Sequence, residues 1–208
     1  MGIVISLIVL VFSAILHEVA HGYVADRLGD PTARLLGRLT LDPRRHIDPF
    51  LSILLPLLLL VSGSPIIFGG AKPVPIDEFN LKDGRKDVAL VSLAGPLTNV
   101  LLAVVATALF RLAQISPLQS QEIVIILLIT FVKINVLLAI FNLLPIPPLD
   151  GSKIFSLVLP NDAAKAYLSL GTMGMFLIFF LLAFPLGSFS LQQMLGSLYT
   201  FVLSLLGF

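Results

Sequence analysis

The chain has 208 residues, of which 57% are hydrophobic and only 12% charged, and its mean hydropathy is +1.04. Because soluble domains carry roughly 25% charged residues, this composition predicts a polytopic membrane protein. The net charge of +1 gives no reason to expect a nucleic acid partner, and the absence of cysteine excludes disulfides, thiolate metal sites and cysteine nucleophiles.

Five apolar segments reach or nearly reach the length of about 20 residues that a helix needs to cross a bilayer. They cover residues 3–27, 88–113, 123–144, 166–186 and 190–207. The first has no basic start and no cleavage site, so we expect a retained helix rather than a signal peptide. The sequence therefore predicts an all-α polytopic membrane protein with about five transmembrane helices. We expect one domain over residues 1–208, with a core over about 1–155 and a C-terminal helical hairpin over about 166–207.

A sixth apolar run, at residues 49–70, contains Pro56 and is broken by SGSP at 62–65. Basic residues occur in the loops on both sides of it, and short cytoplasmic loops collect lysine and arginine. We therefore expect residues 49–75 to form a re-entrant helix and extended return, with both ends cytoplasmic. The same rule places the N-terminus outside and the C-terminus in the cytoplasm. Extended backbone survives at membrane depth only beside a cavity or inside protein, which points to a site nearby.

The first apolar segment ends in a polar motif, HEVAH at residues 17–21. On a helix His17 and His21 lie on one face, about 6 Å apart, as two ligands of one zinc ion require. Glu18 is turned by about 100° from His17, so it can reach a water molecule without binding the metal. This is the HExxH pattern of zinc hydrolases.

The alternative is that these three residues form a structural polar cluster between helices. An ionisable group at the centre of a membrane helix costs about 2.5–3.5 kcal/mol, and three such groups together need a compensating role. We therefore favour the metal site.

A catalytic zinc ion has three protein ligands, so a third ligand must be found. The candidates are His46, in a basic loop, and Asp150, which follows the proline-broken end of an apolar segment. In the expected topology Asp150 and the HEVAH turn both lie toward the cytoplasmic side, so Asp150 is favoured. His46 is expected to brace its loop.

Asn135 and Asn142 are seven residues apart and lie on nearly the same face of one predicted helix. Two amides on one buried face form a polar seam. The seam either packs against the other helices or touches the substrate backbone.

Four motifs together resemble those of the site-2 protease family of intramembrane zinc metalloproteases. They are HEVAH at 17–21, GGAKPVP at 69–75, SLAGPLTN at 92–99 and NLLPIPPLDG at 142–151. The resemblance implies that His17, His21 and Asp150 bind one zinc ion per chain and that Glu18 is the general base. It also implies that Asn142, Gly69, Gly70 and Pro73 contact substrate. Gly95, Pro96, Asn99 and Asn135 are expected near the site, with Gly95 and Asn99 serving close helix packing rather than catalysis.

The resemblance further implies cleavage of peptide bonds in or near the transmembrane helices of membrane proteins. The closest likeness is to compact family members without PDZ or CBS domains, and we expect a prokaryotic plasma membrane. The partners are then membrane-protein substrates and the lipid bilayer, with no nucleic acid. Two alternatives stay open. One is a zinc peptidase whose third ligand is Glu78 or Glu122, and the other is a non-enzymatic transporter or helix-binding protein.

Overall fold

The computed structural model of the chain describes residues 2–47, 54, 57–58, 61, 72–115 and 121–208. Within these residues the regular elements are helices, and the one β-bridge joins Leu186 and Phe189. The α-helices are α1 (Gly2–Leu28), α2 (Thr32–Leu35), α4 (Arg85–Gln114), α5 (Glu122–Asn142), α6 (Asp150–Phe155), α7 (Asn161–Leu168), α8 (Gly171–Ala183) and α9 (Leu191–Leu206). Single 3₁₀ turns are η1 (Pro43–Arg45), η3 (Glu78–Asn80) and η5 (Ser156–Val158).

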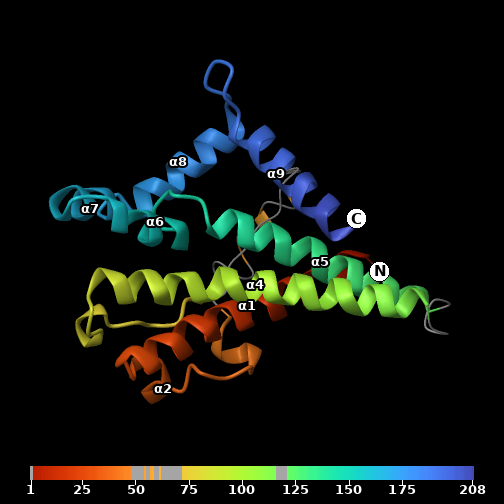
Figure 1. Ribbon diagram of the computed structural model, residues 1–208, viewed down its shortest axis with the longest axis horizontal. Coiled ribbons are helices and arrows are strands. Elements are labelled where there is room, and N and C mark those ends of the chain that lie inside the picture. The colour runs from red at the N-terminus through yellow and green to blue at the C-terminus, as the bar shows by residue number, and fades with distance from the viewer. Residues whose placement is uncertain (1, 48–53, 55–56, 59–60, 62–71, 116–120) are drawn as a thin grey trace.

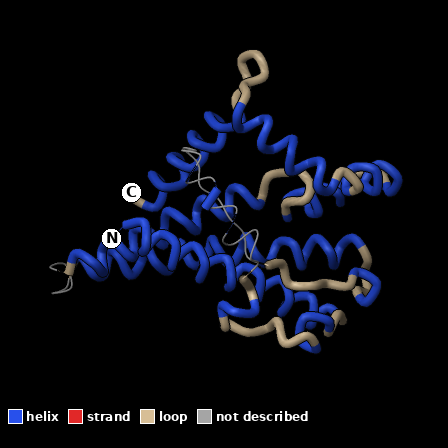
Figure 2. Tube along the Cα trace, turned by 180° about the vertical axis from the view of Figure 1, so that it is seen from behind, coloured by secondary structure: helices blue, strands red, loops and turns tan. Residues whose placement is uncertain are grey.

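Three long helices form the body of the molecule. Helix α4 packs against both α1 and α5, and α1 also contacts α5; Figure 1 labels the three helices, and Figure 2 shows the Cα trace of the bundle from behind. Helices α1 and α5 run in the same direction and α4 runs against them (Figure 1). The C-terminal part of α1, the N-terminal half of α4 and the chain that follows α5 therefore lie at the same end of the bundle.

Helix α1 is a continuous apolar helix because no proline interrupts it and its apolar residues follow one another without a charged break until Glu18. It ends where Gly29 adopts a φ of +118°, a conformation that side chains with a Cβ rarely take. The Asp30 amide then donates to the carbonyl of Ala25 at 2.9 Å, which closes the helix terminus. The sequence LGD at 28–30 is thus a helix stop.

A buried carboxylate fixes the loop after α1. Asp30 is fully buried and accepts hydrogen bonds from the amide of Asp77 at 2.8 Å and from Asn80 Nδ2 at 3.0 Å, as well as from Thr32. Burial raises the pKa of Asp30, but these hydrogen bonds lower it further, so its pKa lies below the ordinary value. Asp30 therefore ties the end of α1 to the segment that precedes α4.

Helix α4 can lie close to its two neighbours because its buried face is made of small residues. Ala94, Gly95, Ala103 and Ala106 are all buried on this helix. Small side chains let helix backbones approach in a membrane, where dispersion and hydrogen bonds replace the hydrophobic effect as the packing force.

The predicted spans can now be compared with the helices. Segments 3–27, 88–113 and 123–144 correspond to α1, α4 and α5, which are long and apolar enough to cross a membrane. The predicted segment 166–186 is not one straight helix, because Asn161–Leu168 and Met173–Ala183 are bent by 71° at a break. Segment 190–207 corresponds to α9, which has 16 residues.

By length and composition the described residues therefore hold three candidate spans, or four if the bent pair is one span. The predicted count of about five is not confirmed. The re-entrant segment predicted at 49–75 lies mostly outside the described residues.

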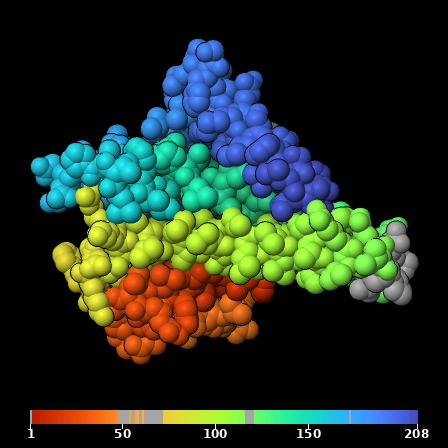
Figure 3. Space-filling model, viewed as in Figure 1, coloured from red at the N-terminus to blue at the C-terminus, as the bar shows by residue number. Residues whose placement is uncertain are grey.

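Helices α8 and α9 form a hairpin that projects from the three-helix body (Figures 1 and 3). A cluster of Leu144, Leu149, Ile178 and Leu191 joins this hairpin to the chain around α6. Gly174 of α8 lies against the carbonyl of Pro147, where a Cβ would overlap that carbonyl. The hairpin is thus seated on the proline-rich turn that leads to Asp150.

Candidate metal centre

The structure brings His17, His21 and Asp150 together at one point. Asp150 Oδ2 lies 3.1 Å from His17 Nε2 and 3.2 Å from His21 Nε2. One ligand atom from each residue lies within 4.8 Å of the other two, and the imidazole rings are nearly perpendicular with centroids 4.6 Å apart. Two residues of α1 and the first residue of α6 therefore form one group with the donor types of a metal site.

Both imidazoles are held by hydrogen bonds at the nitrogen that faces away from this point. His21 Nδ1 donates to the backbone carbonyl of Val91 at 2.7 Å, and His17 Nδ1 lies 2.6 Å from Asn99 Oδ1. A proton on Nδ1 leaves Nε2 with a lone pair, the form that binds a metal. Both Nε2 atoms point to Asp150.

This arrangement fits a cation. The three residues are buried, with exposed fractions of 6% for His17, 6% for His21 and 9% for Asp150. Water therefore screens the charges among them only weakly. Two nitrogen lone pairs and a carboxylate oxygen that converge in a buried site need a positive charge between them. Two histidines and one carboxylate suit a zinc ion with one open position.

Gly95 of α4 lies directly against the two imidazoles. A Cβ at this position would lie 2.5 Å from two atoms of the His17 ring and would also overlap Nε2 of His21. The next residue, Pro96, is buried and has no amide hydrogen, so this turn of α4 lacks one helical hydrogen bond. At this position α4 therefore has room for no side chain larger than hydrogen beside the two imidazoles.

Asn99 takes part in a series of buried hydrogen bonds. Besides its contact with His17, its Nδ2 donates to Asn135 Oδ1 at 2.8 Å, and Asn135 Nδ2 donates to Ser13 Oγ at 2.9 Å. Asn99, Asn135 and Ser13 have no exposed surface. A buried chain of hydrogen bonds thus joins α1, α4 and α5 behind His17.

Glu18 points to a different neighbour. Its Oε2 accepts a hydrogen bond from the amide of Val74 at 2.8 Å. The backbone before Val74 is held in turn, because Arg38 donates to the carbonyls of Lys72 and Pro73 and the Lys72 amide donates to the carbonyl of His46. The Glu18 carboxylate is therefore oriented by a fixed piece of extended backbone.

The remaining predicted residues that the structure describes are not part of the metal group. Asn142 Nδ2 donates to the carbonyl of Leu138 in its own helix at 3.1 Å, and Pro73 is exposed with its carbonyl bound by Arg38. Gly69 and Gly70 lie outside the described residues. His46 is buried, and its Nε2 donates to the Thr40 carbonyl at 2.7 Å.

Neither alternative carboxylate joins the metal group found in the described part of the chain. Glu78 begins the η3 turn in the segment before α4. Glu122 begins α5, about 20 Å along the helix axis from Asn135.

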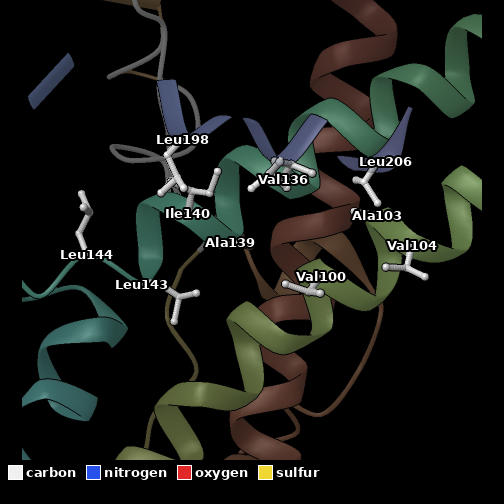
Figure 4. Close-up of a pocket in the computed structure, with 11 residues that line it drawn as sticks. Val100, Ala103, Val104, Val136, Ala139, Ile140, Leu143, Leu144, Leu198 and Leu206 are labelled. Atoms are coloured by element: carbon white, nitrogen blue, oxygen red, sulfur yellow. The ribbon is translucent and has the colours of Figure 1, made fainter. Parts of the chain in front are cut away.

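An apolar cavity of about 390 Å³ lies between α4, α5 and α9 (Figure 4). Its lining is Val100, Ala103, Val104, Val136, Ala139, Ile140, Leu143, Leu144, Leu198, Val202 and Leu206. The side chains of this lining are all hydrocarbon, so none of them can bind a metal or transfer a proton.

Sequence reasoning missed the backbone groups of the site. The Val91 carbonyl holds His21 and the Val74 amide holds Glu18, but every residue has these groups, so no residue type marks them. It also missed the partners of Asn99. The available signal was that Asn99 and Asn135 are amides in otherwise apolar helices, where an unpaired polar group is costly.

Comparison with known proteins points to one family. The model of peptidase family M50 matches residues 5–121 and 107–184. A Bacillus subtilis (strain 168) protein named as zinc metalloprotease YwhC is 37% identical over 194 residues, which are 91% of this chain and 85% of the relative.

Two further relatives are also named as zinc metalloproteases. Rip2 of Mycobacterium tuberculosis is 38% identical over 139 residues, 67% of this chain and 51% of the relative, so the match spans about half of Rip2. MJ0611 of Methanocaldococcus jannaschii is 33% identical over 151 residues, 73% of this chain and 69% of the relative. No solved structure matches the chain significantly.

Proposed function

The chain belongs to peptidase family M50 and is a zinc metalloprotease of the membrane, and from this premise we propose that it cleaves membrane proteins within or near their transmembrane helices. The observation that carries the proposal is the position of the metal group. His17 and His21 lie on a helix long and apolar enough to span a bilayer, and Asp150 lies beside them. A peptide bond that reaches these residues would lie in or close to the membrane.

In this proposal His17, His21 and Asp150 hold one zinc ion, and residues 1–155 carry the catalytic core. When bound, zinc supplies a Lewis acid that polarises the scissile carbonyl and makes water more acidic. The protein side chains supply the orientation: the Val91 carbonyl and Asn99 hold the imidazoles, and Gly95 leaves room for both rings.

Glu18 is the proposed general base. Its carboxylate would take a proton from the attacking water and later give it to the nitrogen of the leaving amine. The hydrogen bond from the Val74 amide occupies Oε2, which leaves Oε1 for the water. Asn142 and Pro73, with Gly69 and Gly70, are proposed to contact the substrate backbone. The N-terminus is proposed to lie outside and the C-terminus in the cytoplasm of a prokaryotic cell.

The test is cleavage of a single-span membrane protein by the purified full chain in detergent. Wild type and Glu18→Gln are compared after their zinc content has been measured. We expect both to hold one zinc ion per chain and the variant to lose at least about 100-fold in rate, as general-base removal does. Equal rates at equal zinc content would show that Glu18 is not the base.

A further inference from the structure

The two histidines of the metal group are held in different ways. His21 Nδ1 donates to a backbone carbonyl, which can only accept. His17 Nδ1 instead faces the side-chain amide of Asn99, which presents either an acceptor or a donor depending on how the amide is turned. If the amide were reversed, its NH₂ would face Nδ1, and the neutral ring would carry its proton on Nε2. A histidine with a proton on Nε2 cannot bind a metal through that atom.

We propose that Asn99 is a positioning residue that keeps the proton of His17 on Nδ1, and that Asn135 fixes the orientation of the Asn99 amide. This inference rests on the proposed ligand set of His17, His21 and Asp150. It assigns a role in metal binding to two fully buried residues, one of α4 and one of α5.

The orientation follows from one backbone carbonyl. Asn135 Nδ2 lies 2.9 Å from the carbonyl oxygen of Phe131, which can only accept, so the NH₂ group of Asn135 must be on that side. Its Oδ1 then faces Asn99, 2.8 Å away, and there it can only accept. The NH₂ of Asn99 must therefore face Asn135, and its Oδ1 must face His17.

This series of hydrogen bonds has no alternative arrangement in which every donor faces an acceptor. Ser13 Oγ lies 2.9 Å from Asn135 Nδ2 and accepts a hydrogen bond from it. This second hydrogen bond fits the same orientation of the Asn135 amide. Asn99, Asn135 and Ser13 are fully buried, so water cannot replace a lost partner. Reversal of either amide would set donor against donor or acceptor against acceptor in a dry interior, which is costly.

The test is a titration with Zn²⁺ alone, in competition with a chelator, on purified full-length chains in detergent. Two substitutions both break the Asn99–Asn135 hydrogen bond, but only one removes the acceptor for His17. Asn99→Leu removes it, whereas Asn99→Asp keeps a carboxylate oxygen at His17 Nδ1. We expect Asn99→Leu to weaken zinc binding by about 10–100-fold and Asn99→Asp to bind nearly as tightly as wild type.

Thermal unfolding of the metal-free proteins separates this role from simple packing. If Asn99 only packs, both substitutions lower stability and neither changes zinc affinity selectively. Equal weakening by Asn99→Leu and Asn99→Asp, or no weakening by either, would overturn the proposal. If Asn99→Leu does not fold, Asn99→Ala gives the same comparison.

Two further variants complete the design. Thr107→Val is the matched control, because Thr107 is a buried polar residue of the same helix whose hydroxyl donates only to the Ala103 carbonyl, and zinc affinity should not change. Asn135→Leu leaves Asn99 in place but frees its amide to turn, so we expect a smaller loss than for Asn99→Leu. Unchanged affinity in Asn135→Leu would refute the orienting role of Asn135.

His17→Ala distinguishes failure of this inference from failure of the ligand set. If His17→Ala still binds zinc as wild type does, the proposed ligands are wrong. If His17→Ala loses zinc while Asn99→Leu keeps it, the ligands stand and the role of Asn99 is refuted.

Discussion

Substitution of Gly95 by alanine tests how tightly the metal group is packed. The added Cβ would lie 2.5 Å from two atoms of the His17 ring, whereas ordinary contact begins at 3.4 Å. Each overlapped ring must therefore move by roughly 0.9 Å. The rings cannot move freely, because His17 is held by Asn99 and His21 by the Val91 carbonyl.

The effect on folding and the effect on the reaction should differ. Overpacking costs about 1–3 kcal/mol, and the better helix propensity of alanine offsets nearly 1 kcal/mol of that. Stability therefore falls by at most about 2 kcal/mol. A displacement near 1 Å at reacting groups costs about 100-fold in rate. We expect Gly95→Ala to fold and to cleave a single-span substrate about 100-fold more slowly than wild type.

The assay is the initial rate of cleavage, measured beside thermal unfolding in the same detergent. Gly196→Ala is the control, since Gly196 is also helical but has open space where the Cβ would lie. The control should keep its rate and lose no stability. If Gly95→Ala cleaves within twofold of wild type, the close contact between α4 and the two imidazoles is refuted.

Three further outcomes are expected. Removal of zinc by a chelator should lower the midpoint of thermal unfolding of wild type but not of Asp150→Ala. The reason is that zinc at 100 times its Kd stabilises the folded state by about 2.7 kcal/mol. Equal shifts of the midpoint in the two proteins would refute the role of Asp150 as a ligand. Because the folded-state pKa of Asp30 lies below 3.8, its contribution to stability is present above that pH and is lost as pH falls through the lower value. Asp30→Asn should therefore flatten the acid limb of a stability–pH profile, and an unchanged limb would contradict this. Gly174→Ala should destabilise by about 1–3 kcal/mol in thermal unfolding, since its Cβ would overlap the Pro147 carbonyl, and an unchanged midpoint would contradict that contact.

The long helices could be predicted from the sequence because their apolar runs are uninterrupted. Segment 3–27 corresponds to Gly2–Leu28, and segment 88–113 to Arg85–Gln114. Segment 166–186 has a similar composition, but apolar content does not determine the direction of a helix, and the chain bends between Leu168 and Met173. Hydropathy therefore identified apolar residues there without identifying the break.

The metal group was predictable in part for a related reason. His17 and His21 are one helical turn apart, so their convergence is local and follows from spacing alone. Asp150 lies 133 residues from His17 in sequence, and its place depended on the proline-rich turn that ends an apolar segment. The hydrogen bond between His17 and Asn99 could not be predicted, because it depends on how α1, α4 and α5 pack.

The central claim is that this metalloprotease cuts its substrates within or near a transmembrane helix, and the position of the cut tests it most directly. The zinc-loaded chain, reconstituted with a single-span membrane protein, should release fragments whose masses place the new termini within or next to the transmembrane segment, and Glu18→Gln should release none. Fragments cut only far from the transmembrane segment would contradict the account.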